Sequence, residues 1–185
     1  MIGIFGSAFN PPSLGHKDAL IQAAKHCEKI LLLPSASHAF GKDMLPYEIR
    51  YHMVSAFARD IQSEVTCPME VSSLEQEMAA EGISPIYTFD VLDRLETELG
   101  TNQLAFILGP DNANPDTWAR FYKHQEIDQR WQKLICKEQQ AIRSTLIREK
   151  VAEGADTQTL FSLTTPSVIE LIRTNNLYRP SNKVN

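Results

Sequence analysis

The sequence predicts an α/β protein in which helices cover both faces of a parallel sheet. Short apolar runs alternate along the chain with stretches that repeat apolar residues at helical spacing. Two loops of small and polar residues, 6–16 and 109–112, each follow one of these apolar runs. A chain of 185 residues has the length of a single domain.

The order of apolar runs and amphipathic stretches predicts the elements. The predicted strands are residues 2–5, 29–33, 69–71, 104–108 and 133–136. The predicted helices are residues 19–27, 49–61, 89–99, 145–151 and 166–173. Because each crossover helix returns the chain to the same end of the sheet, the strands are expected to pair in parallel. This is a Rossmann-like, doubly wound sheet of about five or six strands in one domain.

The loop at residues 6–16 is predicted to bind an anion. It leads from the first strand into a helix whose first N–H groups have no intrahelical partner and carry the positive end of the dipole. His16 is placed to face an anion bound there. Ligands of doubly wound sheets bind beyond the carboxyl ends of the strands, at the switch point. We therefore expect residues 6–16 and 109–112 to face one cleft.

The composition argues against several classes of partner. The net charge of −5 disfavours a broad nucleic-acid-binding face. Cys27, Cys67 and Cys136 are odd in number and far apart, which suggests neither a disulfide framework nor a zinc site. No apolar run approaches the roughly 20 residues of a membrane span. We expect a cytoplasmic protein with small-molecule substrates and no membrane or nucleic-acid partner. The sequence does not decide whether the chain forms a homo-oligomer.

The first loop lacks the glycine patterns G-x-G-x-x-G and G-x-x-x-x-G-K-[ST] of common nucleotide-binding loops. Residues 6–16 read Gly-Ser-Ala-Phe-Asn-Pro-Pro-Ser-Leu-Gly-His. This string resembles the G-x-F-x-P-x-H-x-G-H signature of the nucleotidyltransferase superfamily that carries the HxGH motif. Taken alone, it also fits a turn rich in proline and glycine.

A second motif of that superfamily, I-S-[ST]-x-x-I-R, resembles residues 142–148, which read Ile-Arg-Ser-Thr-Leu-Ile-Arg. Ser144 and Thr145 would open a helix with hydroxyls and amides that suit phosphate oxygens. Arg148, about one turn further on, would bring a forked cation to the same anion. By itself this segment fits a capped surface helix with a solvated arginine. The two motifs occur in the order that they have in the superfamily.

Three further segments narrow the resemblance to the nicotinate or nicotinamide mononucleotide adenylyltransferases. They are residues 87–92, residues 104–112 followed by Trp118, and residues 167–179. The resemblance implies one nucleotidyltransferase-like domain over residues 1–185, with a C-terminal helical portion at 144–179. In this family the tryptophan packs against the pyridine ring, and the backbone at Tyr87 and Thr88 meets its carboxylate or amide. Without the resemblance, Trp118 would be read as a core aromatic residue.

The resemblance implies transfer of AMP from ATP to the 5′-phosphate of the pyridine mononucleotide, with release of pyrophosphate. Mg²⁺ would arrive on the triphosphate, and no metal ligand is implied in the protein. The implied catalytic residues are His16, Arg148, Lys42 and Ser13, although Lys42 fits a surface lysine equally well. The implied ATP-binding residues are Gly6, Ser7, Ala8, Phe9, Gly15, His16, Gly109, Asp111, Ser144, Thr145 and Arg148. The implied mononucleotide-binding residues are Asn10, Tyr87, Thr88 and Trp118.

The chain departs from the family pattern in two places. Ser13 stands where the signature has its first histidine, and removing one such donor typically costs about 10²–10³ in rate. Residues 137–143 are shorter than the corresponding family segment. Two alternatives stay open. One is another adenylyltransferase, such as a pantetheine-phosphate adenylyltransferase, against which Tyr87, Thr88 and Trp118 and the closing residues 177–178 weigh. The other, which these departures keep open, is a nucleotide-binding paralogue without turnover.

Overall fold

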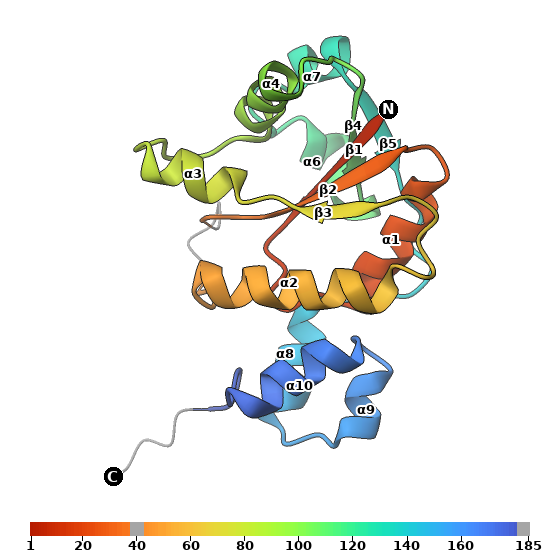
Figure 1. Ribbon diagram of the computed structural model, residues 1–185, viewed down its shortest axis with the longest axis vertical. Helices are drawn as coiled ribbons and strands as arrows, with labels where there is room; N and C mark the ends of the chain where they lie inside the picture. The colour runs from red at the N-terminus through yellow and green to blue at the C-terminus, as the bar shows by residue number, and fades with distance from the viewer. Residues whose placement is uncertain (38–42, 181–185) are drawn as a thin grey trace.

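The computed structural model describes residues 1–37 and 43–180. At its centre lies a five-stranded sheet with the order β3-β2-β1-β4-β5, in which every pair of strands is parallel (Figure 1). The strands are β1 (Ile2–Ser7), β2 (Lys29–Pro34), β3 (Met69–Val71), β4 (Leu104–Leu108) and β5 (Gln132–Ile135). The predicted fold class, the parallel pairing and all five predicted strands are confirmed.

Helices lie on both faces of the sheet (Figure 1). They are α1 (Leu14–Ala24), α2 (Tyr47–Ile61), α3 (Leu74–Ala80), α4 (Thr88–Leu99), α5 (Pro110–Ala113), α6 (Pro115–Trp118), α7 (His124–Arg130), α8 (Ser144–Ala152), α9 (Thr157–Phe161) and α10 (Pro166–Thr174). The five predicted helices correspond to α1, α2, α4, α8 and α10. The sequence analysis missed α3, α5, α6, α7 and α9, because helices of four to seven residues are too short to repeat an apolar pattern.

Alternate side chains of the strands build two cores. Phe5 and Ile30 face the core that contains α1, α2 and the C-terminal helices. Ile4 and Leu31, each one residue away, face the core that contains α3, α4 and α7. This alternation follows from the two-residue repeat of a strand. Because helices cover both faces of the sheet, a ligand can reach the strands only at their ends, and a site is expected there.

The sheet has a switch point between β1 and β4. The chain moves outward from β1 to β2 and β3, and then returns across β1 to form β4 and β5. The carboxyl ends of β1 and β4 therefore carry loops that lead away in opposite directions. Helices α8 to α10 lie beyond α2 (Figure 1), where Ser167 donates from its N–H and its hydroxyl to the Asp60 carboxylate at 2.9 and 2.6 Å.

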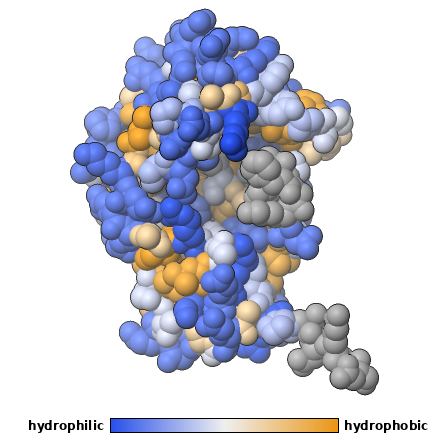
Figure 2. All heavy atoms as spheres, turned by 180° about the vertical axis from the view of Figure 1, so that it is seen from behind, coloured by the Kyte–Doolittle hydropathy of each residue, from blue (hydrophilic) through white to orange (hydrophobic). Residues whose placement is uncertain are grey.

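The face of the molecule opposite to that of Figure 1 is mainly hydrophilic (Figure 2). Its hydrophobic side chains gather in a patch across the lower part and in smaller groups on the two sides of the upper part. Within residues 1–37 and 43–180, no helix combines the length and the apolar character that crossing a membrane requires.

Candidate active site

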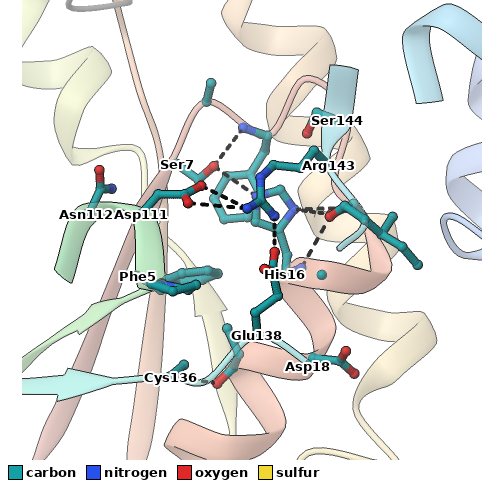
Figure 3. Close-up of a pocket in the computed structure, with 18 of the residues that line it drawn as sticks. Phe5, Ser7, His16, Asp18, Asp111, Asn112, Cys136, Glu138, Arg143 and Ser144 are labelled. Carbon is teal, nitrogen blue, oxygen red and sulfur yellow. Dashed lines mark hydrogen bonds and ion pairs between the residues drawn. The ribbon is translucent and has the colours of Figure 1, made fainter. Parts of the chain in front are cut away.

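A pocket of about 370 Å³ lies at the carboxyl ends of β1 and β4, at the switch point (Figure 3). Residues from the segments 6–16 and 109–112 both line it, which confirms that these loops face one cleft. The start of α8 forms a further wall. The predicted residues that line the pocket are Gly6, Ser7, Ala8, Phe9, Asn10, Ser13, Gly15, His16, Gly109, Asp111, Ser144, Thr145 and Arg148. Its size is typical of a small-molecule site.

His16 lies in the first turn of α1 with both ring nitrogens in hydrogen bonds. The Ser13 N–H donates to Nδ1 at 2.9 Å, so Nδ1 is the acceptor and Nε2 carries the proton. Nε2 donates to Ser7 Oγ at 3.0 Å. The ring packs against Phe5 and Phe9, with centroids 5.9 and 4.9 Å away. Burial lowers the pKa of His16 to about 4, so the imidazole is neutral at pH 7 and its Nε2–H is a donor in the pocket lining.

The neutral imidazole of His16 predicts that the stability of the protein depends on pH. The pKa of His16 is 6.5 in a model peptide and about 4 in the folded chain. Between these values the unfolded chain binds more protons, so the free energy of unfolding rises with pH. The contribution of His16 is complete above pH 6.5 and is lost as the pH falls toward 4. We expect a loss of about 2 kcal/mol between pH 7 and pH 4.5 from this residue alone.

Urea unfolding of the wild type and of His16→Gln at both pH values measures this contribution. Glutamine cannot titrate, but at the third position of a helix it can accept the N–H bond of the capping residue as the imidazole does. Other groups that titrate on acidification affect both proteins alike, and the difference between the two losses isolates His16. Equal losses in the two proteins would contradict a buried, neutral imidazole.

Ser13 is buried and caps α1. Its Oγ accepts from the His16 N–H at 3.4 Å, while its own N–H donates to the His16 ring, which makes a reciprocal capping box with histidine in the place of the usual glutamate. This cap explains why α1 begins at Leu14, five residues before the predicted start, and the helix ends at Ala24 instead of at residue 27. Ser13 thus holds His16 in place as well as lining the pocket.

Gly15 is required for space. A Cβ atom at this position would lie 2.3 Å from the carbonyl oxygen of Ile142. The shortened segment 137–143 therefore packs directly on the first turn of α1. Gln22 holds the other end of this segment, because its amide nitrogen donates to the Lys137 carbonyl and its amide oxygen accepts from the Lys137 N–H, both at 2.9 Å.

The second motif forms the start of α8 and is tied to the first loop. Ser144 Oγ donates to the Pro11 carbonyl at 2.6 Å, and Arg148 Nη1 donates to the Asn10 carbonyl at 2.8 Å. Arg148 Nη2 also donates to Thr145 Oγ1 at 3.2 Å. The N–H groups in the first turn of a helix have no intrahelical partner, so α8 adds amide donors and a positive dipole end to the pocket wall. In α1 the Leu14 N–H donates to the Leu163 carbonyl at 2.9 Å and the His16 N–H donates to Ser13 Oγ, so this helix adds mainly its dipole end.

Asn10 is held by residues that the sequence analysis did not connect with it. The Tyr178 hydroxyl donates to Asn10 Oδ1 at 2.7 Å, and the Leu45 N–H reaches the same oxygen at 3.4 Å. Burial raises the pKa of Tyr178, which keeps this donor protonated. The buried Arg50 donates to the carbonyls of Ala8 and Leu45, both at 2.8 Å. No sequence signal marks Arg50, because it lies among the apolar residues of an amphipathic helix.

Trp118 lies in the core on the α4 side of the sheet. It is buried, its ring centroid is 4.8 Å from that of Phe121, and its Nε1–H donates to Asp128 at 3.0 Å. The Lys133 ammonium lies 4.3 Å from the ring centroid. Trp118 is not among the described residues that line the pocket, and its implied contact with a pyridine ring stays a prediction.

The other predicted residues outside the pocket lining are Tyr87 and Thr88. Tyr87 is 40% exposed and stacks on Tyr122 with centroids 4.5 Å apart, and Thr88 begins α4. Their implied role toward the mononucleotide stays a prediction. Lys42 lies outside the described residues.

Two charged pocket residues were not predicted from the sequence, Arg143 and Glu138, and Arg143 contacts both Asp111 and Glu138. Arg143 Nη2 lies 3.0 Å from Asp111 Oδ2, and Arg143 Nη1 donates to Glu138 Oε1 (Figure 3). Arg143 escaped prediction because the motif that the segment resembles has a serine at this position. Glu138 escaped prediction because it belongs to the shortened segment. The only signal for them in the sequence was that both are charged residues in the short segment before α8.

The pocket contains carboxylates but no metal cage within the described chain. Asp18, Asp43, Asp111 and Glu138 line it. In the described ranges, no three His, Cys, Asp or Glu side chains come close enough together to hold a metal ion. This donor set suits Mg²⁺ that is already bound to phosphate oxygens and water, which is the usual way for proteins to bind magnesium nucleotides.

The fold and the pocket together define a class of protein. A doubly wound parallel sheet whose switch point opens into a pocket lined by the N-terminal ends of two helices and an arginine is typical of α/β proteins that bind nucleotides. A family model described as cytidylyltransferase-like matches residues 4–150. The chain belongs to the cytidylyltransferase-like family and is therefore a nucleotidyltransferase.

Relatives place the chain near one branch of this family. The crystal structure of a putative nicotinate-nucleotide adenylyltransferase from Vibrio parahaemolyticus is 37% identical, covers 97% of this chain and 96% of its own, and superposes with a TM-score of 0.77. A probable nicotinate-nucleotide adenylyltransferase of Anaeromyxobacter dehalogenans is 27% identical over 96% of both chains. The nicotinic acid mononucleotide adenylyltransferase of Plasmodium falciparum, complexed with NaAD, has the same fold with a TM-score of 0.70 at 17% identity, covering 96% of both chains. The resemblance to this family that the sequence motifs carry is thereby confirmed.

Proposed function

We propose that the protein transfers AMP from ATP to the 5′-phosphate of nicotinate mononucleotide, releases pyrophosphate and so acts in NAD biosynthesis. The observation that carries the proposal is that the two motifs, residues 6–16 and 142–148, lie far apart in the chain but line one pocket. They do so in a member of the cytidylyltransferase-like family that is 37% identical over nearly its whole length to a putative nicotinate-nucleotide adenylyltransferase. A phosphate-binding loop alone would support only nucleotide binding.

The reaction needs positioning and charge neutralisation more than acid or base chemistry. A 5′-phosphate oxygen of the mononucleotide attacks the α-phosphorus of ATP, and the bond from the α-phosphorus to the β-phosphate oxygen breaks. Pyrophosphate leaves with the electron pair of that bond. Because both reactants are anions, the protein must hold them in line and neutralise the charge that develops on the leaving group.

The residues of the pocket suit this task. His16 would turn its Nε2–H from Ser7 to a phosphate oxygen, and the phosphate charge would favour protonation of the ring. Arg148 and the amides at the start of α8, which line the same pocket, would bind the same triphosphate. Ser13 and Asn10 would keep the loop in shape, and Lys42 would assist at the phosphates. Mg²⁺ would enter with ATP and reduce the charge of the leaving pyrophosphate.

Release of pyrophosphate tests the proposal. The purified protein is incubated with ATP and Mg²⁺ and with one acceptor at a time: nicotinate mononucleotide, nicotinamide mononucleotide, phosphopantetheine or flavin mononucleotide. We expect the highest kcat/KM with nicotinate mononucleotide. Turnover with phosphopantetheine alone would replace the proposal by its closest alternative. Binding of ATP in calorimetry, with no turnover for any acceptor, would identify a nucleotide-binding protein without catalysis.

A further inference from the structure

Arg143 projects into the pocket between two carboxylates. Its guanidinium contacts Asp111, in α5 just after β4, and Glu138, just after β5 (Figure 3). Arg143 lines the same pocket as His16 and Arg148. It is also the N-cap residue of α8, so its backbone adjoins the amide donors of that helix, although its side chain makes no capping hydrogen bond. A cation at this place lies beside groups that already suit an anion.

We propose that Arg143 is a second triphosphate-binding arginine, which incoming ATP takes over from Asp111 and Glu138. The inference rests on the proposed function for the identity of the ligand, and it adds a residue that the resemblance does not assign. In the ligand-free pocket the two carboxylates hold the guanidinium in position. When ATP enters, phosphate oxygens replace them as the partners of the same fork of N–H donors.

The ion pairs of Arg143 are easily exchanged. The side chains of Arg143, Asp111 and Glu138 are 48%, 72% and 37% exposed, and ion pairs this accessible to water add little to stability. Arg148 differs, because it donates to the Asn10 carbonyl and to its own helix and thereby ties two segments of the fold together. Arg143 can therefore change partners without disturbing the loop, while Arg148 cannot leave its place as freely.

The segment that carries Arg143 is already anchored to α1. Gln22 binds both backbone groups of Lys137, and the backbone of Ile142 lies against Gly15 and within 3.4 Å of Ser13 Oγ. The backbone next to Arg143 needs no large movement to bind a ligand. Such a pre-organised position lowers the entropic cost of binding.

The charge of the pocket makes this arginine important. Among the described lining residues, the cations are Lys137, Arg143 and Arg148, and the carboxylates are Asp18, Asp43, Asp111 and Glu138. The carboxylates outnumber the cations, although the proposed ligand is a polyanion. Loss of Arg143 would remove one cation and would also leave Asp111 and Glu138 without the partner that neutralises them. Both effects oppose binding of a triphosphate.

Calorimetric titration of the full chain tests the proposal without relying on turnover. ATP with Mg²⁺ and inorganic tripolyphosphate are titrated separately, with no mononucleotide present. We expect Arg143→Ala to weaken the binding of both ligands by about tenfold. The loss of a charge-assisted pair with phosphate outweighs the small cost of exchanging partners, which the variant does not have. We expect Glu138→Gln to bind both ligands more tightly than the wild type, because Arg143 then has one competing carboxylate fewer.

Arg94→Ala is the matched control. Arg94 also joins two carboxylates, those of Glu81 and Glu98, and its side chain is 37% exposed, but it lies on α4 away from the pocket. This variant loses the same charge and the same kind of ion pairs, so its affinity for both ligands should equal that of the wild type. Similar melting temperatures of the two alanine variants would show that Arg143→Ala is folded.

The outcomes distinguish a failure of the role of Arg143 from a failure of the proposed function. Equal affinities of the wild type and Arg143→Ala would overturn the role of Arg143 and leave the proposed function standing. If Arg143→Ala binds ATP more weakly but binds tripolyphosphate as the wild type does, Arg143 does not contact the triphosphate. If the wild type binds neither ligand, the proposed function is overturned, and with it the role of Arg143 that rests on it.

Discussion

Replacing His16 by glutamine is expected to lower kcat by about 10²–10³. The imidazole Nε2–H is the donor at the pocket end of α1, and it lines the same pocket as the arginine of α8. Glutamine retains the capping bond from the Ser13 N–H but places no rigid donor at the position of Nε2. The loss should therefore appear in turnover more than in folding. Pyrophosphate release at saturating ATP and nicotinate mononucleotide measures it.

His16→Ala should lose at least as much activity and also some stability, since the Ser13 N–H then loses its acceptor on the imidazole, although the bond from the residue 16 N–H to Ser13 Oγ remains. Comparing the two variants separates the chemical role of the ring from its structural role. An active wild type whose His16→Gln variant keeps full turnover would remove His16 from the mechanism, whatever the alanine variant does.

Gly15→Ala is expected to cost about 3 kcal/mol of folding free energy or more and to weaken ATP binding. The added Cβ would lie 2.3 Å from the Ile142 carbonyl oxygen, and this obstacle is backbone, which cannot rotate away as a side chain can. Either α1 or the segment 137–143 must shift. Both shifts would separate the first loop from the start of α8, so the walls of the pocket would no longer converge. Denaturant unfolding and calorimetric titration with ATP measure the two effects.

Gly109→Ala provides the matched control for stability. Gly109 also lines the pocket, but its φ is −76°, and the described structure has no atom within 4 Å of an added Cβ. The free energy of unfolding of Gly109→Ala should equal or slightly exceed that of the wild type, because alanine restricts the conformations of the unfolded chain. If Gly15→Ala unfolds at the same denaturant concentration as this control, the close approach of Ile142 is not a constraint in solution.

Local pattern was sufficient to predict the sheet. Buried parallel strands appear as continuous apolar runs, and residues 104–108 and 69–71 were located without error. Short helices such as α6 and α7 escaped prediction, since one or two turns give too few positions for a periodic signal. The beginning of α1 was misplaced because a capping box that uses histidine does not match the usual S-x-x-E pattern.

The walls of the pocket were predicted better than its contacts. The motifs at residues 6–16 and 142–148 pointed to one anion site, and the structure brings both to the same pocket. The sequence could not show that Ser144 and Arg148 also bind carbonyls of the first loop, or that Tyr178 and Arg50 support that loop. Those partners are distant in the chain, and no local pattern records them.

The amino-acid order alone specifies the alternation of strands and helices, the end of the sheet at which the pocket opens, and the two segments that line it. These properties depend on hydrophobic periodicity and on short motifs, which act over a few residues. The protonation of His16, the exchangeable partners of Arg143 and the contact between Gly15 and Ile142 arise only in the folded chain. Burial, ion pairing and close packing depend on neighbours that folding brings together from distant parts of the sequence.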